Sequence, residues 1–170
     1  IEALKHDQAG NSAAAARLRA QALDTAEPAA FRVDGVDVEW IADADSRLGP
    51  VLEVIVNGQY YWLPFESCSG VSFEKPVDLR DLVWCPAEIM LPNEGRVPAL
   101  VPTRYVGTTE ATSGNADTLK LAAATEWVAR GEDVWFGLGQ RMFTSDHGDH
   151  PILDTRLIAR PEVIADHRVG

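Results

Sequence analysis

The sequence contains 170 residues, of which 46% are hydrophobic and 24% are charged, and its formal net charge is −11 at pH 7. These values are typical of a single globular domain that buries its own core and needs no disulfide staples. The negative charge repels phosphate backbones, so we expect no nucleic-acid partner. No apolar stretch approaches the roughly 18 residues of a membrane span, so we expect no membrane association.

The start of the chain and its two cysteines both bear on where the protein is located. The sequence begins at Ile1 without a methionine, so we expect a fragment of a longer protein. No basic leader followed by an apolar region opens it, which favours a cytoplasmic protein. Cys68 and Cys85 form no CxxC pair, and we interpret them as reduced apolar residues, although a disulfide between them stays open.

The N-terminal residues have a helical pattern. Ile1–Lys5 reads as the end of one helix, and Asn11 or Ser12 is a suitable N-cap for a second. Ala13–Leu23 is rich in alanine, and Pro28 disfavours helix in the residue before it. Two helices this short cannot bury their own apolar faces. We therefore expect them to pack on the rest of the chain, on a missing preceding part or on a partner.

Strand patterns begin at Phe31. Val36–Ala42 mixes Val, Trp and Ile with acids, as a half-buried strand does. Val51–Val56 and Gln59–Phe65 are two β-rich runs joined by Asn57-Gly58, which is the strongest short-range signal for a tight hairpin. The sequence therefore predicts a hairpin at this turn.

The rest of the chain alternates short strands with turns. We expect further strands at 70–74, 87–91, 97–105, 125–129, 134–144 and 152–159, and short helices at 78–83 and 117–124. The fold class predicted is α+β, with an N-terminal helical segment, a mostly antiparallel twisted sheet and one or two short helices. The pattern leaves open whether the sheet closes into a barrel.

Four polar residues follow the strand that contains Trp40. Asp43 and Asp45 lie two apart, so on a strand they would share a face and could act as an acid–base pair. Alternatively, Asp43, Asp45, Ser46 and Arg47 bond to backbone groups and to each other, and fix a loop. We favour the second, structural interpretation.

A second polar group lies near the C-terminus. Asp146, His147, Asp149 and His150, with Asp154 beyond them, offer the nitrogen and oxygen ligands that Zn²⁺ or Mn²⁺ prefers. They fall in an expected turn, where Asp and Gly serve the backbone geometry, and we favour that role. No P-loop, GxSxG or HExxH motif occurs in the sequence. We therefore predict no catalytic residue, no metal and no cofactor.

Aromatic residues have two interpretations. Most should lie in the core, because aromatic side chains dominate core burial. An exposed aromatic beside Arg47, Arg104 or Arg141 would be a candidate interface residue, since Trp, Tyr and Arg are enriched at binding hot spots. We add Trp62 to this set of structural or interface candidates.

Four segments in the same order resemble the ImpE family, also called TagJ, of accessory proteins of bacterial type VI secretion. They are WIADADSRLGPVLE (40–53) with its hairpin, DLRDLVWCPA (78–87), VPTRY (101–105) and TEW (125–127) followed by GLGQRM (137–142). The resemblance extends from Leu18 to Ile158. It implies that residues 1–27 end a helical, tetratricopeptide-like region, that 28–160 form the ImpE-like domain and that 161–170 are a tail.

The resemblance implies a non-enzymatic adaptor in the cytoplasm. Family members associate with the small subunit of the contractile sheath and influence its recycling by a disassembly ATPase, so we expect the sheath subunit as a partner and the ATPase as an indirect one. The family places its sheath contact in the helical N-terminal part, of which this chain keeps only the end. The alternatives are a metal-dependent hydrolase that uses the Asp146–His150 turn and a small-ligand-binding β domain.

Overall fold

Antiparallel sheets dominate the computed structural model, which describes residues 2–25, 29–112, 114–131 and 133–161. The largest sheet has eight strands in the order β2 (Val36–Val38), β1 (Phe31–Val33), β13 (Leu157–Ala159), β6 (Gly70–Phe73), β7 (Trp84–Met90), β8 (Arg96–Pro102), β4 (Val51–Val56) and β5 (Gln59–Pro64). A three-stranded sheet has the order β12 (Gly148–Pro151), β11 (Met142–Ser145) and β3 (Ile41–Asp43). A separate hairpin pairs β10 (Val134–Gly139) with β9 (Thr125–Gly131).

The mostly antiparallel sheet of the predicted fold class is confirmed, but its N-terminal helical segment is wrong, because strands make most of the structure and helices are few. The described helices are α1 (Glu2–Gln8), α2 (Ser12–Thr25), α3 (Ala116–Lys120) and the 3-10 turns η1 (Phe65–Ser67) and η2 (Thr108–Glu110). Only α2 is long. The helical layer that was predicted to precede the sheet is therefore not formed. The physical reason is that the main apolar core takes its buried side chains from the strands and their connections, and none from those side chains of α1, α2 and α3 that the structure describes.

The hairpin predicted at Asn57-Gly58 is confirmed. β4 and β5 pair from Val51 with Pro64 to Val56 with Gln59, so the turn holds only these two residues. Asn57 has φ 51° and Gly58 has φ 76°, the positive values that a two-residue turn of this kind requires.

Other predicted elements differ from the structure. The run 134–144 is divided into β10 and β11, because Gly139 has φ 88° and turns the chain. The run 36–42 is likewise divided into β2 and β3. Residues 78–83 form turns instead of a helix, since the Asp81 carboxylate accepts the Val77 amide at 2.9 Å and Leu79 stays exposed. Local hydrogen bonds from Asp compete there with the helical ladder.

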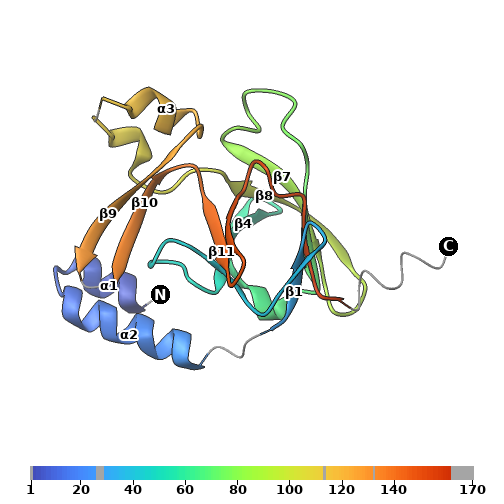
Figure 1. The fold of residues 1–170 in the computed structure, drawn as a ribbon, viewed down its shortest axis with the longest axis horizontal. Coiled ribbons are helices and arrows are strands. Elements are labelled where there is room, and N and C mark those ends of the chain that lie inside the picture. Colours follow the sequence, from blue (N-terminus) through green and yellow to red (C-terminus); the bar gives the residue numbers. More distant parts are fainter. Residues whose placement is uncertain (1, 26–28, 113, 132, 162–170) are drawn as a thin grey trace.

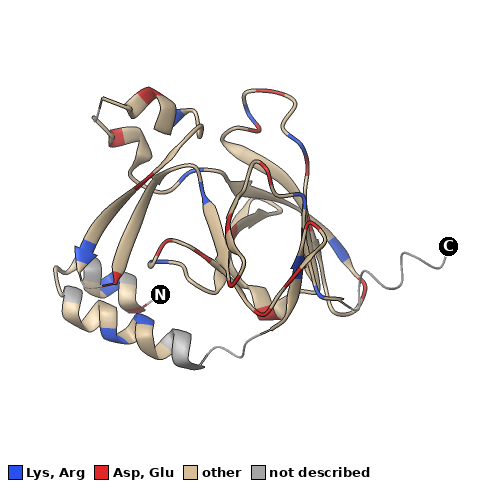
Figure 2. Ribbon diagram, in the orientation of Figure 1, with Lys and Arg blue, Asp and Glu red and all other residues tan. Residues whose placement is uncertain are grey.

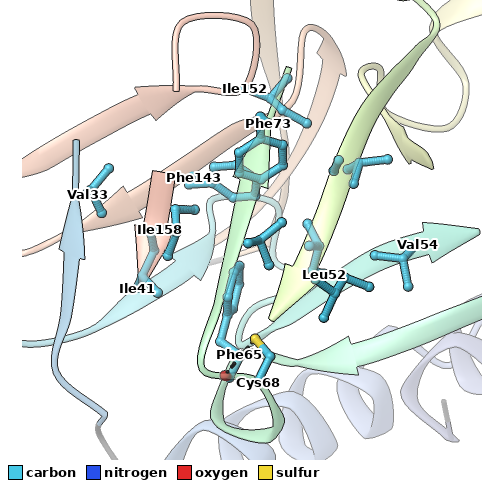
Figure 3. Close-up of a cluster of buried hydrophobic side chains, with 14 of the residues drawn as sticks. Val33, Ile41, Leu52, Val54, Phe65, Cys68, Phe73, Phe143, Ile152 and Ile158 are labelled. Carbon is cyan, nitrogen blue, oxygen red and sulfur yellow. Dashed lines mark hydrogen bonds between the residues drawn. The ribbon is translucent and has the colours of Figure 1, made fainter. Parts of the chain in front are cut away.

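Phe65, in η1, is buried in the core. Its ring meets Phe31 and Phe143 edge-on, at centroid distances of 6.3 and 5.9 Å. Figure 3 shows Phe65, Phe143 and aliphatic side chains such as Leu52 and Ile158 gathered between strands of the eight-stranded and three-stranded sheets. The eight-stranded sheet does not close into a barrel within the described structure, because its outer strands β2 and β5 are not paired to each other.

The β9–β10 hairpin stands apart from this core. In Figure 1 it runs between α3 at one end and α1 and α2 at the other. The guanidinium of Arg19 in α2 lies 5.5 Å from the ring centroid of Phe136 in β10, which fixes α2 beside the hairpin. No helix within the described ranges is both long and apolar enough to cross a bilayer.

Candidate functional site

The loop after β3 is shaped by its own aspartates. The Asp43 carboxylate accepts the Asp45 amide at 2.9 Å, and the Asp45 carboxylate accepts the Arg47 amide at 2.8 Å. In each case an Asp side chain accepts the backbone amide of the residue two positions later. This arrangement is an Asx turn, which Asp forms readily. Asp43 and Asp45 are both buried, at 3% and 0% exposed.

The same loop attaches to β10. Ser46 and Trp135 exchange two bonds of 3.0 Å, from the Ser46 amide to the Trp135 carbonyl and from the Trp135 amide to Ser46 Oγ. The Gly137 amide donates to Asp45 Oδ2 at 2.7 Å, and Arg47 donates to the Gly137 carbonyl at 3.2 Å. These bonds join the loop, and through it the rest of the fold, to the β9–β10 hairpin.

Arg141 forms the centre of a buried ionic network. Its side chain is fully buried, donates to Asp43 at 2.6 Å and to the Pro102 carbonyl at 2.8 Å, and also pairs with Glu53. A buried guanidinium is tolerated only where charge partners and hydrogen bonds replace water. Asp43 and Glu53 pull its pKa up against the opposing effect of burial.

Tyr105 completes the network on the side of Asp43. Its hydroxyl lies 3.0 Å from Asp43 Oδ1 and accepts the Met142 amide at 2.9 Å. Its ring packs closely against Gly137, where an added Cβ would be 2.3 Å from two ring carbons. Burial and the charge of Asp43 raise the pKa of Tyr105, so the phenol stays protonated.

Asp43 is the titratable member of the network. Burial raises its pKa to about 6, although Arg141, the Asp45 amide and the Tyr105 hydroxyl each favour the carboxylate. A carboxyl group with such a pKa is suited to acid–base chemistry, but this one is 3% exposed and surrounded by its own protein. The arrangement holds three segments of chain together and offers no access to a substrate.

The remaining candidates do not all join this network. Arg104 donates to the Lys120 carbonyl, away from Asp43. Trp62 donates to the Tyr60 hydroxyl at 2.6 Å, and Tyr60 in turn donates to Glu53, so Trp62 reaches the network only through two other residues. The structure thus brings together Asp43, Asp45, Ser46, Arg47 and Arg141. It connects Trp62 to them through Tyr60 and Glu53, whereas Arg104 bonds elsewhere.

The acid and histidine group lies in the β11–β12 hairpin. Asp146 accepts the Glu39 amide at 2.9 Å, and the His150 ring lies 2.9 Å from Ser145 Oγ. His147 approaches Asp146 at 3.6 Å. Within the described ranges, no three His, Cys, Asp or Glu residues are placed so that they could hold a metal ion.

An open groove of about 580 Å³ lies where β7 and β8 meet the loop that contains η2. Its walls include Trp84, Tyr105 and Val106, and Arg104 and Glu110 contribute the charged groups. The groove is a surface depression and not the wide enclosed cavity that a small-ligand-binding barrel would show.

Comparison with known sequences identifies the family. The sequence model described as "ImpE protein" matches residues 35–159. The chain belongs to the ImpE family. It is 46% identical over 156 residues to the type VI secretion system accessory component TagJ of Pseudomonas aeruginosa, an alignment that covers 92% of this chain and 53% of that protein. The chain therefore spans about half the length of that relative.

A solved structure shares the fold. A crystal structure of a protein from Vibrio parahaemolyticus superposes with a TM-score of 0.77 and 23% identity, over 90% of this chain and 55% of that one. At this identity the similarity concerns the fold alone.

Three of the segments that carry the ImpE resemblance meet in the network. WIADADSRLGPVLE supplies Asp43, Asp45 and Glu53, VPTRY supplies Tyr105, and GLGQRM supplies Arg141. Sequence reasoning did not single out Glu53 or Tyr105. Two features of the sequence could have pointed to them. Each lies within a segment that resembles the ImpE family, and each is a polar residue with apolar neighbours in that segment.

Proposed function

We propose that this chain is a non-enzymatic part of an accessory protein of a bacterial type VI secretion system. The observation that carries the proposal is membership of the ImpE family together with 46% identity to the accessory component TagJ. We further propose that it acts in the cytoplasm on the contractile sheath, through the small sheath subunit, and influences sheath recycling by the disassembly ATPase only indirectly.

The chemistry of the buried network supports an adaptor over an enzyme. Asp43, Asp45 and Arg141 are at most 3% exposed and are bonded to one another's segments. A catalytic acid or base must come within hydrogen-bond reach of a substrate, and these groups are enclosed by protein. Their cross-links instead stiffen a surface that a partner can meet without reordering it.

The family resemblance supports separate roles for the N-terminal residues and for the rest of the chain. We propose that residues 1–27 end a helical region that makes the sheath contact, and that 28–160 form the ImpE-like domain. The acidic charge of the chain favours a basic patch on whatever this domain meets. The predicted tail, 161–170, falls almost wholly outside the described residues.

A pull-down of purified sheath subunits tests the proposal. The bait is the full-length protein in one arm and this chain in the other, and the bound sheath subunit is quantified on gels. Capture by the full-length protein with weaker or no capture by this chain is expected. Failure of the full-length protein to capture the small sheath subunit would overturn the sheath assignment.

The hydrolase alternative is tested separately by metal analysis. We expect no stoichiometric metal in the purified protein. Stoichiometric Zn²⁺ or Mn²⁺ that disappears in the His147→Ala/His150→Ala variant would support a metal-dependent enzyme and contradict the adaptor.

A further inference from the structure

β5 is an outer strand of the eight-stranded sheet, and within the described structure it pairs only with β4. It spans six residues, Gln59–Pro64, and its register with β4 contains no bulge. An outer strand exposes a row of unpaired amides and carbonyls, which proteins usually protect with charges, bulges, proline or a short length. In β5 only Pro64, at the last position, offers such protection.

The main-chain groups that face the open side of β5 belong to Tyr60 and Trp62. The Phe65 amide donates to the Pro50 carbonyl at 3.0 Å, so Phe65 directs its amide toward the β4 side. Residues of an antiparallel pair alternate between bonded and non-bonded positions, so Tyr61 also directs its main chain to β4. Tyr60 and Trp62 therefore direct their amides and carbonyls outward.

The aromatic side chains of β5 are exposed, and their polar atoms already have partners. Tyr60 and Tyr61 are 55% and 46% exposed. The Trp62 indole donates to the Tyr60 hydroxyl at 2.6 Å, and that hydroxyl donates to Glu53. The rings can consequently pack on another apolar surface without leaving an unpaired polar group behind.

β5 carries no charged residue, whereas the rest of the protein is rich in charge. Figure 2 shows acidic and basic residues over the helices, loops and strands, and the chain has a net charge of −11. The other open sheet edges in the described ranges are short or charged. β2 and β3 have three residues each, β9 includes Glu126 and Arg130, and β12 includes Asp149. The outer side of β10 is already bonded to the loop after β3.

We propose that β5 pairs with β5 of a second copy of this chain, antiparallel and about a two-fold axis at Tyr61. A contact of this symmetry sets each surface against itself, so a charged edge would repel its own copy and a neutral edge does not. An uncharged strand also offers a charged partner no complementary group. This inference adds a contact to the proposed function and does not depend on it.

The register about Tyr61 uses every outward main-chain group of the strand. Tyr60 lies opposite Trp62 of the partner subunit, and each of the two symmetric pairs exchanges amides and carbonyls. The same pairing sets aromatic side chains directly opposite one another, an arrangement that stabilises sheets. Pro64 falls opposite the turn residue Gly58 of the partner subunit, so its missing amide hydrogen interrupts no bond. A longer foreign strand would continue past Pro64 and meet that gap.

Sedimentation velocity of this chain and of the full-length protein, over a concentration series, measures the association. We expect a monomer of 18.5 kDa for this chain in equilibrium with a dimer. The dissociation constant should be about 10 µM, because contact along one pair of strands is small. Added salt should strengthen the dimer, since it screens the repulsion between two acidic copies.

Charge variants at the two-fold axis test the register. Tyr61→Lys sets two like charges opposite each other and should raise the dissociation constant at least about tenfold. Val36→Lys is the matched control, because Val36 is 48% exposed on β2 at the opposite edge of the same sheet, and it should change the constant by less than about twofold. Tyr61→Glu alone should also be monomeric, whereas an equal mixture with Tyr61→Lys should recover the dimer, since opposite charges then meet.

Urea unfolding of each variant confirms that it is folded before association is compared. A monomer throughout the concentration series, an unchanged dimer in Tyr61→Lys, or a mixture of the Lys and Glu variants that stays monomeric would each overturn the proposal. A dimer of this chain that the full-length protein does not form would also overturn it, and would assign the β5 edge to another segment of the longer protein.

Discussion

Replacing Arg141 with methionine tests whether the ionic network holds the fold together. The side chain is fully buried and is bonded to Asp43, Glu53 and the Pro102 carbonyl. Methionine keeps much of the apolar bulk but leaves two carboxylates facing each other without a cation. Removing one partner of a buried ion pair costs about 3–5 kcal/mol, so we expect the free energy of unfolding of Arg141→Met to fall by that amount.

The assay is urea unfolding at neutral pH, followed by tryptophan fluorescence and extrapolated linearly to water. The matched control is Arg96→Gln, because Arg96 pairs with Glu88 at 2.6 Å with both side chains well exposed. An exposed pair contributes at most about 1 kcal/mol. A loss in Arg141→Met no larger than that in the control would refute the structural role of the network.

The pH dependence of the same variant follows from Asp43. Its pKa is raised to about 6 by burial, and Arg141 is the largest influence that opposes the rise. Without Arg141 the pKa of Asp43 must rise further, so the folded state binds more protons than the unfolded state between the ordinary pKa of 3.8 and the raised one. Stability then falls as pH rises. The loss of unfolding free energy in Arg141→Met, relative to the unaltered protein, should be smaller near pH 5 than near pH 8. An equal loss at both pH values would contradict this explanation.

Three further variants or reagents test single features. Gly137→Ala should lower the free energy of unfolding by about 1–3 kcal/mol, because its Cβ would meet the Tyr105 ring at 2.3 Å; urea unfolding measures it. Gly58→Ala should cost about 1 kcal/mol in the same assay, since φ is 76° there. Burial raises the pKa of Cys68 and of Cys85 to about 11, so neither thiol should react with an aromatic disulfide reagent at neutral pH until urea unfolds the chain. Rapid native-state reaction would contradict the burial of these thiols.

Local chemistry was predictable from the sequence, and long-range pairing was not. The Asn57-Gly58 turn could be predicted because its signal lies within the two residues that adopt positive φ. The partners of Arg141 lie 88 and 98 residues away along the chain, and no local pattern distinguishes it from Arg104. Only the register of β3, β4 and the segment after β10 decides which arginine is enclosed by carboxylates.

The error in fold class has a related cause. An alanine-rich run indicates that a helix can form, but it does not say whether that helix contributes to the core. Only Ala15 among the described side chains of α1 and α2 is fully buried, while the strands supply the main cluster around Phe65. Helix propensity correctly indicated that these residues form helices, but it could not show that the helices contribute little to the buried core.

The segments that identify the ImpE family do not thereby identify its partner. They supply Asp43, Glu53, Tyr105 and Arg141, whose side chains are mostly enclosed and hold the loop, the hairpin and the sheet in one arrangement. A partner can contact only exposed groups, such as Arg130. Arg141→Met should consequently lower the free energy of unfolding, whereas Arg130→Gln should leave it within about 0.5 kcal/mol of the unaltered protein. Urea unfolding of the two variants separates the buried, structural positions from the exposed ones, and an equal loss in both would contradict this distinction.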